Sequence, residues 1–66
     1  MDFVAYTIMD ADSGERFSTT DYLATQDGLM EATRERNCLA LHYGTEFCLR
    51  VAGIDAAGTL HKLDTE

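Results

Sequence analysis

The first part of the chain alternates between apolar and polar positions as a β-strand does. Across residues 3–10, Val4, Tyr6 and Ile8 share one face, and the β-branched and aromatic content favours a strand. The turn-forming sequence DADSG follows, and residues 16–23, rich in threonine and aromatic residues, predict a second strand. The two segments predict a hairpin with a loop of about four residues centred on 12–14.

The pattern changes to a helical one over residues 24–37. Thr25 is the expected N-cap, and Asp27 lies in the first turn, where the helix dipole favours a carboxylate. Gly28 weakens this first turn by ~1 kcal/mol relative to alanine. Asn37 is expected to end the helix, and a longer helix beginning near Thr20 is the alternative.

The remaining sequence predicts three more strands. Alternation recurs over residues 38–44, 46–54 and 59–63, with turns at Gly44–Thr45 and over 55–58, and residues 64–66 are expected to fray. The order β-β-α-β-β-β predicts an α+β fold: a small antiparallel sheet with one helix packed on one face. The length allows one domain, which spans residues 1–66.

The expected core collects the apolar residues of these elements. Its members are Val4, Tyr6, Ile8, Leu29, Met30, Leu39, Leu41, Phe47, Leu49 and Val51. A chain this short buries only ~60% of the surface that its unfolded form exposes, so its stability is expected to be small. A sheet face carrying Phe3, Ala5 and Met9 could pair with a second copy, which leaves a homodimer open.

The net charge of the chain limits the classes of partner that it is expected to bind. Twelve acidic side chains against five basic ones give a net charge of −7. Such a field repels nucleic acid and anionic membranes and attracts basic surfaces, so direct nucleic-acid binding is not expected. Without a signal peptide or an apolar span, and with two cysteines, the chain is expected in the reducing cytoplasm. Acidity that serves only solubility is the alternative reading.

No catalytic or cofactor-binding motif stands out. The soft metal ligands are Cys38, His42, Cys48 and His61, but their spacing has neither the C-x2-C nor the H-x3-H pair of common zinc sites. Ordinary half-buried cysteines and surface histidines are favoured over a structural zinc, and the compartment argues against a disulfide. With no nucleophile elbow in a chain too short to enclose a pocket, we predict no metal, no cofactor and no enzymatic activity.

One acidic pattern remains. Asp27, Glu31 and Glu35 recur every fourth residue, so on a helix they form a row with ~6 Å between neighbours, pointing to solvent. Such a row can resemble a short run of backbone phosphates to a groove lined with lysine and arginine. Further acidic residues would extend this surface if the hairpin loop lies near the helix start: Asp10, Asp12, Glu15 and Asp21. The alternative is an ordinary solvated helix face with an Arg34–Glu31 pair worth ~0.2–0.5 kcal/mol.

In length, charge and acidic segments (DADSGERFSTTD and DGLMEATRE) the chain resembles the small anti-CRISPR proteins of phages and mobile elements. The resemblance is one of composition and carries over no residue roles. It implies a non-enzymatic inhibitor in the host cytosol that binds a type I CRISPR–Cas effector and blocks DNA recognition. The partner would be a basic DNA-binding surface of that complex. An immunity-type or regulatory module that binds one basic protein is the alternative.

Overall fold

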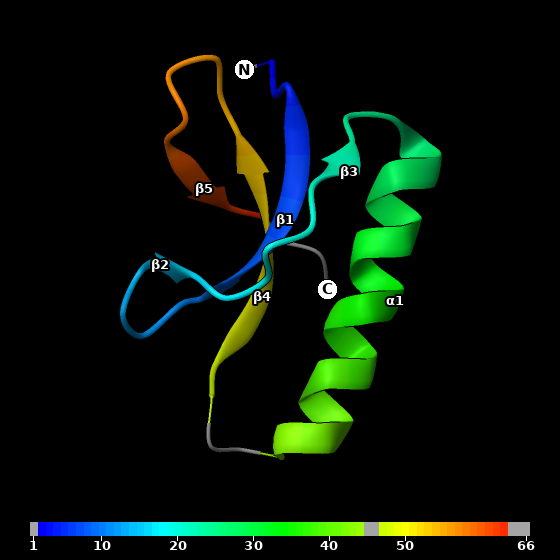
Figure 1. Ribbon diagram of the computed structural model, residues 1–66, viewed down its shortest axis with the longest axis vertical. Coiled ribbons are helices and arrows are strands. Elements are labelled where there is room, and N and C mark those ends of the chain that lie inside the picture. Colours follow the sequence, from blue (N-terminus) through cyan, green and yellow to red (C-terminus); the bar gives the residue numbers. More distant parts are fainter. Residues whose placement is uncertain (1, 45–46, 64–66) are drawn as a thin grey trace.

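The computed structural model describes residues 2–44 and 47–63, and it shows one helix against a curled antiparallel sheet (Figure 1). The elements in chain order are β1 (Ala5–Asp10), β2 (Glu15–Arg16), β3 (Tyr22–Leu23), α1 (Gln26–Tyr43), β4 (Leu49–Ile54) and β5 (Leu60–Lys62). β1 and β4 form the centre of the sheet, β5 pairs with β4, and both β2 and β3 pair with β1. This confirms the predicted α+β class, with one helix and five antiparallel strands. Thr45 and the predicted tail at 64–66 lie outside the described residues.

The predicted N-terminal hairpin is confirmed. Met9 lies opposite Arg16 and Asp10 opposite Glu15, which leaves a four-residue turn between β1 and β2. Gly14 adopts φ 74°, and its N–H donates to the carbonyl of Asp10 at 2.7 Å. The second predicted strand forms as two short pieces, β2 and β3, that pair with β1 on either side of an outward bulge at residues 17–21.

The predicted strand over residues 38–44 is wrong, because α1 continues through Asn37 to Tyr43. Gly44 ends the helix with φ 67°, and its N–H donates to the carbonyl of Ala40 at 2.8 Å. Leu39 and Ala40 are strong helix formers, and they continue the inward side of the helix at helical spacing. A short run of alternating apolar residues fits both periods, and here the helical period prevails.

The start of the helix matches its prediction. The hydroxyl of Thr25 accepts a hydrogen bond from the N–H of Gly28 at 3.1 Å, so Thr25 is the N-cap and the longer helix from Thr20 does not form. Gly28 is buried, and a Cβ atom there would overlap the carbonyl oxygen of Leu23 in β3. Gly28 is therefore required for the close approach of the helix to the sheet backbone rather than being only a weak point in the helix.

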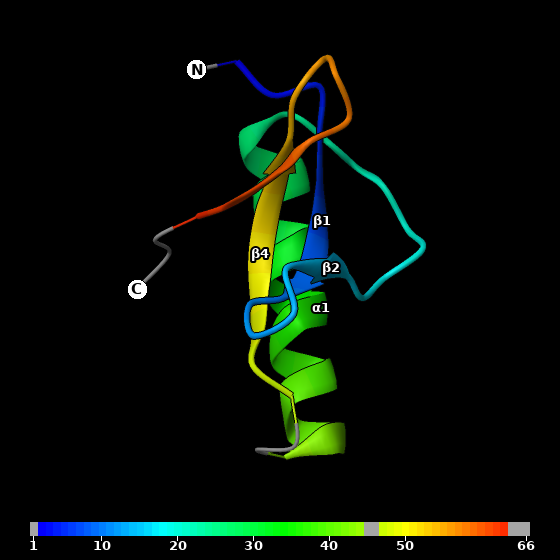
Figure 2. The ribbon, with the colours of Figure 1, turned by 90° about the vertical axis from the view of Figure 1, so that its left-hand side faces the viewer.

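The sheet has two distinct faces. Ile8 lies opposite Val51 and Tyr6 opposite both Gly53 and Tyr22, so these side chains share one face. The negative charges of Glu31 and Glu35 on α1 raise the pKa of Tyr22, so Tyr22 lies near the helix. The face that carries Tyr22 is therefore the one that the helix covers, and we call it the covered face. Thr7 and Ala52 are paired on the opposite side, which we call the open face. Figure 2 views the sheet from the open face, with α1 behind it.

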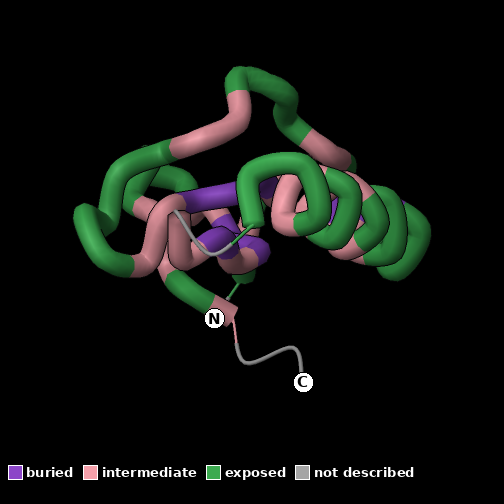
Figure 3. The backbone as a smooth tube through the Cα atoms, turned by 90° about the horizontal axis from the view of Figure 1, so that it is seen from below, coloured by how far each residue is buried: buried purple, intermediate pink, exposed green. Residues whose placement is uncertain are grey.

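The buried core lies at the centre of the sheet and under the helix (Figure 3). Its apolar members are Ile8, Met9, Ala32, Leu49, Val51 and Ala52. The predictions for Ile8, Leu49 and Val51 are confirmed, whereas Tyr6, Leu29, Leu39 and Phe47 are only half-buried. Among the described residues no helix is long and apolar enough to cross a membrane.

Three predicted core residues are in fact exposed: Val4, Met30 and Leu41. Val4 lies in a bend before β1. Leu41 is 87% exposed, because at 100° per residue it lies about 180° around the helix from the buried Ala32. The inward line of α1 is built on glycine and alanine rather than on its larger apolar side chains, which places Met30 and Leu41 outside.

Candidate acidic interface

The acidic row lies on α1, as predicted. Asp27 and Glu31 are exposed, while Glu35 is half-buried. A step of four residues turns ~40° around a helix, so the row winds from the solvent side toward the sheet. In the part of the chain that the structure describes, the ion pairs are Arg16–Asp21 and Asp55–His61, so the Arg34–Glu31 pair does not form. Within the described residues, Asp27, Glu31 and Glu35 therefore have no ion-pair partner.

Tyr22 lies beside the inner end of this row. The pKa of the Tyr22 phenol is raised above its usual 10.0, first by burial and then by the negative charges of Glu35 and Glu31. β3 thus holds a neutral phenol next to the two carboxylates. The sequence alone did not point to Tyr22, because its place beside the helix depends on the pairing of β3 with β1.

The hairpin acids form a separate group. Asp12 and Glu15 are exposed, and Asp10 is half-buried with its Oδ1 accepting the N–H of Asp12 at 3.0 Å. Figures 1 and 2 show the β1–β2 turn on the side of the sheet away from α1 and far from the helix start. The condition for one continuous acidic surface is therefore not met, and Asp10 serves the turn.

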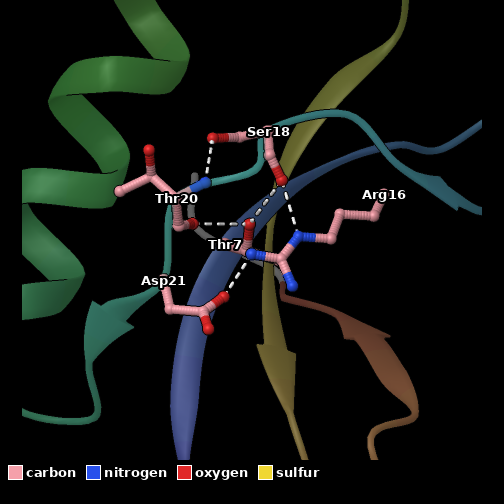
Figure 4. Close-up of polar contacts among 5 residues, drawn as sticks. All are labelled: Thr7, Arg16, Ser18, Thr20 and Asp21. Carbon is pink, nitrogen blue, oxygen red and sulfur yellow. Dashed lines mark hydrogen bonds and ion pairs between the residues drawn. The ribbon is translucent and has the colours of Figure 1, made fainter.

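Asp21 belongs to the bulge between β2 and β3 (Figure 4). Its carboxylate pairs with Arg16, whose Nε donates to the carbonyl of Ser18 at 2.6 Å. The hydroxyl of Thr7 donates from β1 to the carbonyl of Thr20 at 3.0 Å, with a longer contact of 3.4 Å to Ser18. These side-chain contacts hold the bulge against β1, where the interrupted strand lacks backbone hydrogen bonds of the sheet. The carboxylate of Asp21 is paired with Arg16 and has a structural role.

The soft metal ligands do not gather. Cys38 and His42 are exposed on the helix, Cys48 precedes β4, and His61 lies in β5. The residues at 2–44 and 47–63 contain no group of three or more potential ligands that could hold a metal ion. Cys38 and His42 lie on α1 and not on a strand, which separates them from Cys48. Both cysteines are free thiols.

An Asp55–His61 pair closes the β4–β5 turn. One oxygen of Asp55 lies 2.8 Å from Nε2 of His61, and the other accepts the N–H groups of Ala57 and Thr59, each at 2.9 Å. The hydrogen bond from His61, then that from Thr59, lowers the pKa of Asp55 below its ordinary value of 3.8. Sequence reasoning missed this pair, although an aspartate at the first position of the DAAG turn is a recognisable signal. Its contacts fix the turn.

Comparison with known proteins gives no relative: no family model matches the chain, and no curated protein or solved structure is similar to it. The exposed carboxylates of Asp27 and Glu31, which have no ion-pair partner among the described residues, are thus the feature from which a function can be inferred.

Proposed function

We propose that this chain is a non-enzymatic inhibitor that binds the basic DNA-binding surface of a nucleic-acid-handling protein complex through the acidic face of α1. The resemblance in size and charge to anti-CRISPR proteins makes a type I CRISPR–Cas effector in the host cytosol the first candidate. Binding would place Asp27, Glu31 and Glu35 where DNA phosphates are held, and would block DNA recognition.

The observation that carries the proposal is the row of carboxylates without internal partners on a rigid helix. Their spacing of ~6 Å suits lysine and arginine side chains that are arranged to hold successive phosphates. Because the helix is already folded, little conformational entropy is lost when the row is bound. A charge complement of this kind raises the association rate and selects basic partners.

Two exposed apolar side chains on α1 also support a protein partner. Met30 and Leu41 lie within about 20° of each other around the helix and about three turns, or ~16 Å, apart along it, on the outer side of α1. Protein interfaces commonly combine an apolar centre with a charged rim.

The proposed contact surface is smaller than the sequence suggested. Asp10, Asp12 and Glu15 lie on the other side of the sheet, and Asp21 is paired with Arg16. The helix row is therefore the primary contact, and the hairpin acids would engage only a partner that reaches around the sheet.

A matched pair of charge-reversal variants tests the proposal. Asp27→Lys/Glu31→Lys changes the helix row, and Asp12→Lys/Glu15→Lys changes the net charge by the same amount on the hairpin. Each variant competes with target DNA for a purified type I effector. We expect the helix variant to lose about tenfold or more in potency, equivalent to ~1.4 kcal/mol, and the hairpin variant to change little.

The outcomes separate the possibilities. Equal losses in both variants would mean that only diffuse charge matters, and full potency of the helix variant would remove the row from the interface. If the wild-type chain does not compete for the effector at all, that target is wrong. Salt-dependent retention of one basic protein from a host lysate would then favour the immunity-type or regulatory alternative.

A further inference from the structure

The two arginines of α1 have different surroundings. Arg36 is half-buried, and its Nε donates to the carbonyl of Leu49 at 3.0 Å, which ties the helix to the start of β4. Its Nη1 donates to Oδ1 of Asn37 at 2.7 Å. Arg34, by contrast, is exposed, and within residues 2–44 and 47–63 it has no ion-pair partner. Arg36 therefore has a structural role, and Arg34 is left available to a partner.

Arg34 lies at the centre of the outer side of α1. Around the helix, Leu41 and Met30 lie ~20–40° from Arg34 in one direction. Asp27 and Glu31 lie ~20–60° from it in the other direction, and they are exposed as well. Along the helix, Asp27 is ~10 Å before Arg34 and Leu41 is ~10 Å after it. The guanidinium therefore stands between the exposed apolar side chains and the acidic row.

This central position limits what the partner can place opposite Arg34. A partner that contacts both the acidic row and Leu41 also covers Arg34 and removes water from its guanidinium. A covered charge without a counter-charge is costly, and a surface made only of lysine and arginine would add like-charge repulsion. A carboxylate, in contrast, accepts two parallel hydrogen bonds from the planar guanidinium. The partner surface is therefore expected to hold a carboxylate among its basic residues.

Carboxylates stand among phosphate-binding residues where a protein cleaves DNA with Mg²⁺. At such sites the metal is held by one or two carboxylates together with phosphate oxygens of the substrate. The outer side of α1 carries the matching charges: Asp27 and Glu31 correspond to the phosphates, and Arg34 corresponds to the metal ion. This combination suits a DNA-cleaving site better than a uniformly basic groove.

We propose that Arg34 pairs with the metal-binding carboxylates of a DNA-cleaving site in the partner, in the place of Mg²⁺. The inference rests on the proposed function and specifies which part of the DNA-binding surface α1 covers. Arg34 is then a specificity-determining residue, since it favours this site over other basic surfaces that the acidic row alone could bind.

The open face of the sheet does not continue this surface. Of the residues that the sequence suggested for pairing with a second copy, Met9 is buried and Phe3 packs on Gly53 of the covered face. Lys62 lies opposite Ala52 and so projects to the open face, where it is exposed. It carries the same charge as Arg34 on the side of the sheet away from α1, which makes it a matched control.

Arg34→Gln and Lys62→Gln test the proposal, because each removes one positive charge from an exposed position. Inhibition of target-DNA cleavage is measured with the purified type I effector and the nuclease that cuts its bound DNA. Arg34→Gln should lose about tenfold in potency, as for a lost hydrogen bond between charged groups, and Lys62→Gln should lose nothing. Arg34→Glu should lose more than Arg34→Gln, whereas a uniformly basic groove would bind it more tightly than the wild type. All variants should keep the circular dichroism of the wild type.

Competition with Mg²⁺ gives a second readout. Binding of the chain to the same proteins is measured without DNA while Mg²⁺ is raised at constant ionic strength. The wild-type chain should bind more weakly as Mg²⁺ occupies the carboxylates, and Arg34→Gln should respond less, although both carry the same acidic row. An equal response of the two chains overturns the proposal, as does unchanged or increased potency of Arg34→Glu.

Failure of this inference can be distinguished from failure of the proposed function. If Asp27→Lys/Glu31→Lys loses binding while Arg34→Glu gains it, the acidic row stands and only the role of Arg34 is overturned. A wild-type chain that does not bind these proteins at all overturns both, because the role of Arg34 depends on that contact.

Discussion

The two faces of the sheet bury their central residues by different means. On the covered face, Ile8 and Val51 are fully buried under a helix that approaches so closely that Gly28 has no room for a side chain. On the open face Thr7 is equally buried, but by a bulge of its own sheet and the side chain of Arg16 (Figure 4), and the neighbouring Ala52 is buried as well. A single helix covers one face, and the other is protected with small residues and side-chain hydrogen bonds.

The difference extends to the surface. The helix side presents Asp27 and Glu31, which have no ion-pair partner among the described residues, together with Met30 and Leu41. The open face presents the exposed Leu23 and the basic residues Arg50 and Lys62. The two sides are therefore suited to different partners, and they can be altered separately.

The largest effect is expected where the helix meets the sheet. Leu49 is 1% exposed, so Leu49→Ala removes a fully buried side chain and should lower the free energy of unfolding by ~2–5 kcal/mol. A chain of this size has a total stability of the same order, so much of the variant should be unfolded at room temperature. Urea denaturation followed by circular dichroism measures this change.

Leu41→Ala is the matched control, because both leucines were predicted to be core residues. Leu41 is 87% exposed, and its replacement should change the free energy of unfolding by no more than ~0.5 kcal/mol. Comparable losses for the two variants would mean that Leu41 is covered in solution and that α1 does not have a free outer side.

An intermediate effect is expected on the open face. Thr7→Val keeps the shape of the side chain but removes the hydroxyl that donates to the carbonyls of Thr20 and Ser18. We expect a loss of ~1–2 kcal/mol and faster amide hydrogen exchange of the β3 residues, because the bulge loses its tie to β1. Thr59→Val, on an exposed turn, is the control and should leave both quantities nearly unchanged. Unaltered exchange in Thr7→Val would show that the bulge is held by other contacts.

The smallest effect is expected on the pKa of Tyr22, which reports the electrostatic field of the acidic row. Neutralising it with Glu31→Gln/Glu35→Gln should lower the pKa of Tyr22 toward 10.0, since both carboxylates disfavour the tyrosinate. The sign for stability follows: a raised folded pKa gives a contribution that is present below the unfolded pKa and is lost as pH rises through the folded one. NMR titration of the Tyr22 ring measures the shift, and Asp12→Asn/Glu15→Gln should not reproduce it.

The parts of the fold that depend on local chemistry were predictable from the sequence. The turn before Glu15 and the N-cap at Thr25 each rest on a few neighbouring residues, and both are confirmed. The end of the helix was not predictable in this way, because Leu39, Ala40 and Leu41 fit an alternating pattern as well as a helical one. Burial under the helix decides between them, and burial depends on the whole fold.

The candidate functional surfaces also divide into features that follow from local sequence and features that depend on the whole fold. The spacing of Asp27, Glu31 and Glu35 follows from the sequence once a helix is predicted. Whether Asp10, Asp12 and Glu15 join them depends on where the hairpin lies relative to the helix, which no local pattern contains. The place of Tyr22 beside the helix likewise exists only through the pairing of β3 with β1, so it could not be predicted from alternation within any one strand.

Gly28 has a consequence for the direction in which the acidic row points. Since the helix rests on the carbonyl of Leu23 at the one position without a side chain, that contact sets the rotation of the helix about its own axis. Moving the glycine by one residue would turn the favoured contact side by ~100° and swing the carboxylates with it. Gly28 thus sets the direction in which the acidic row points, although Gly28 itself would not contact the proposed partner. Exchanging Gly28 with a neighbouring residue would change that direction without altering any charge.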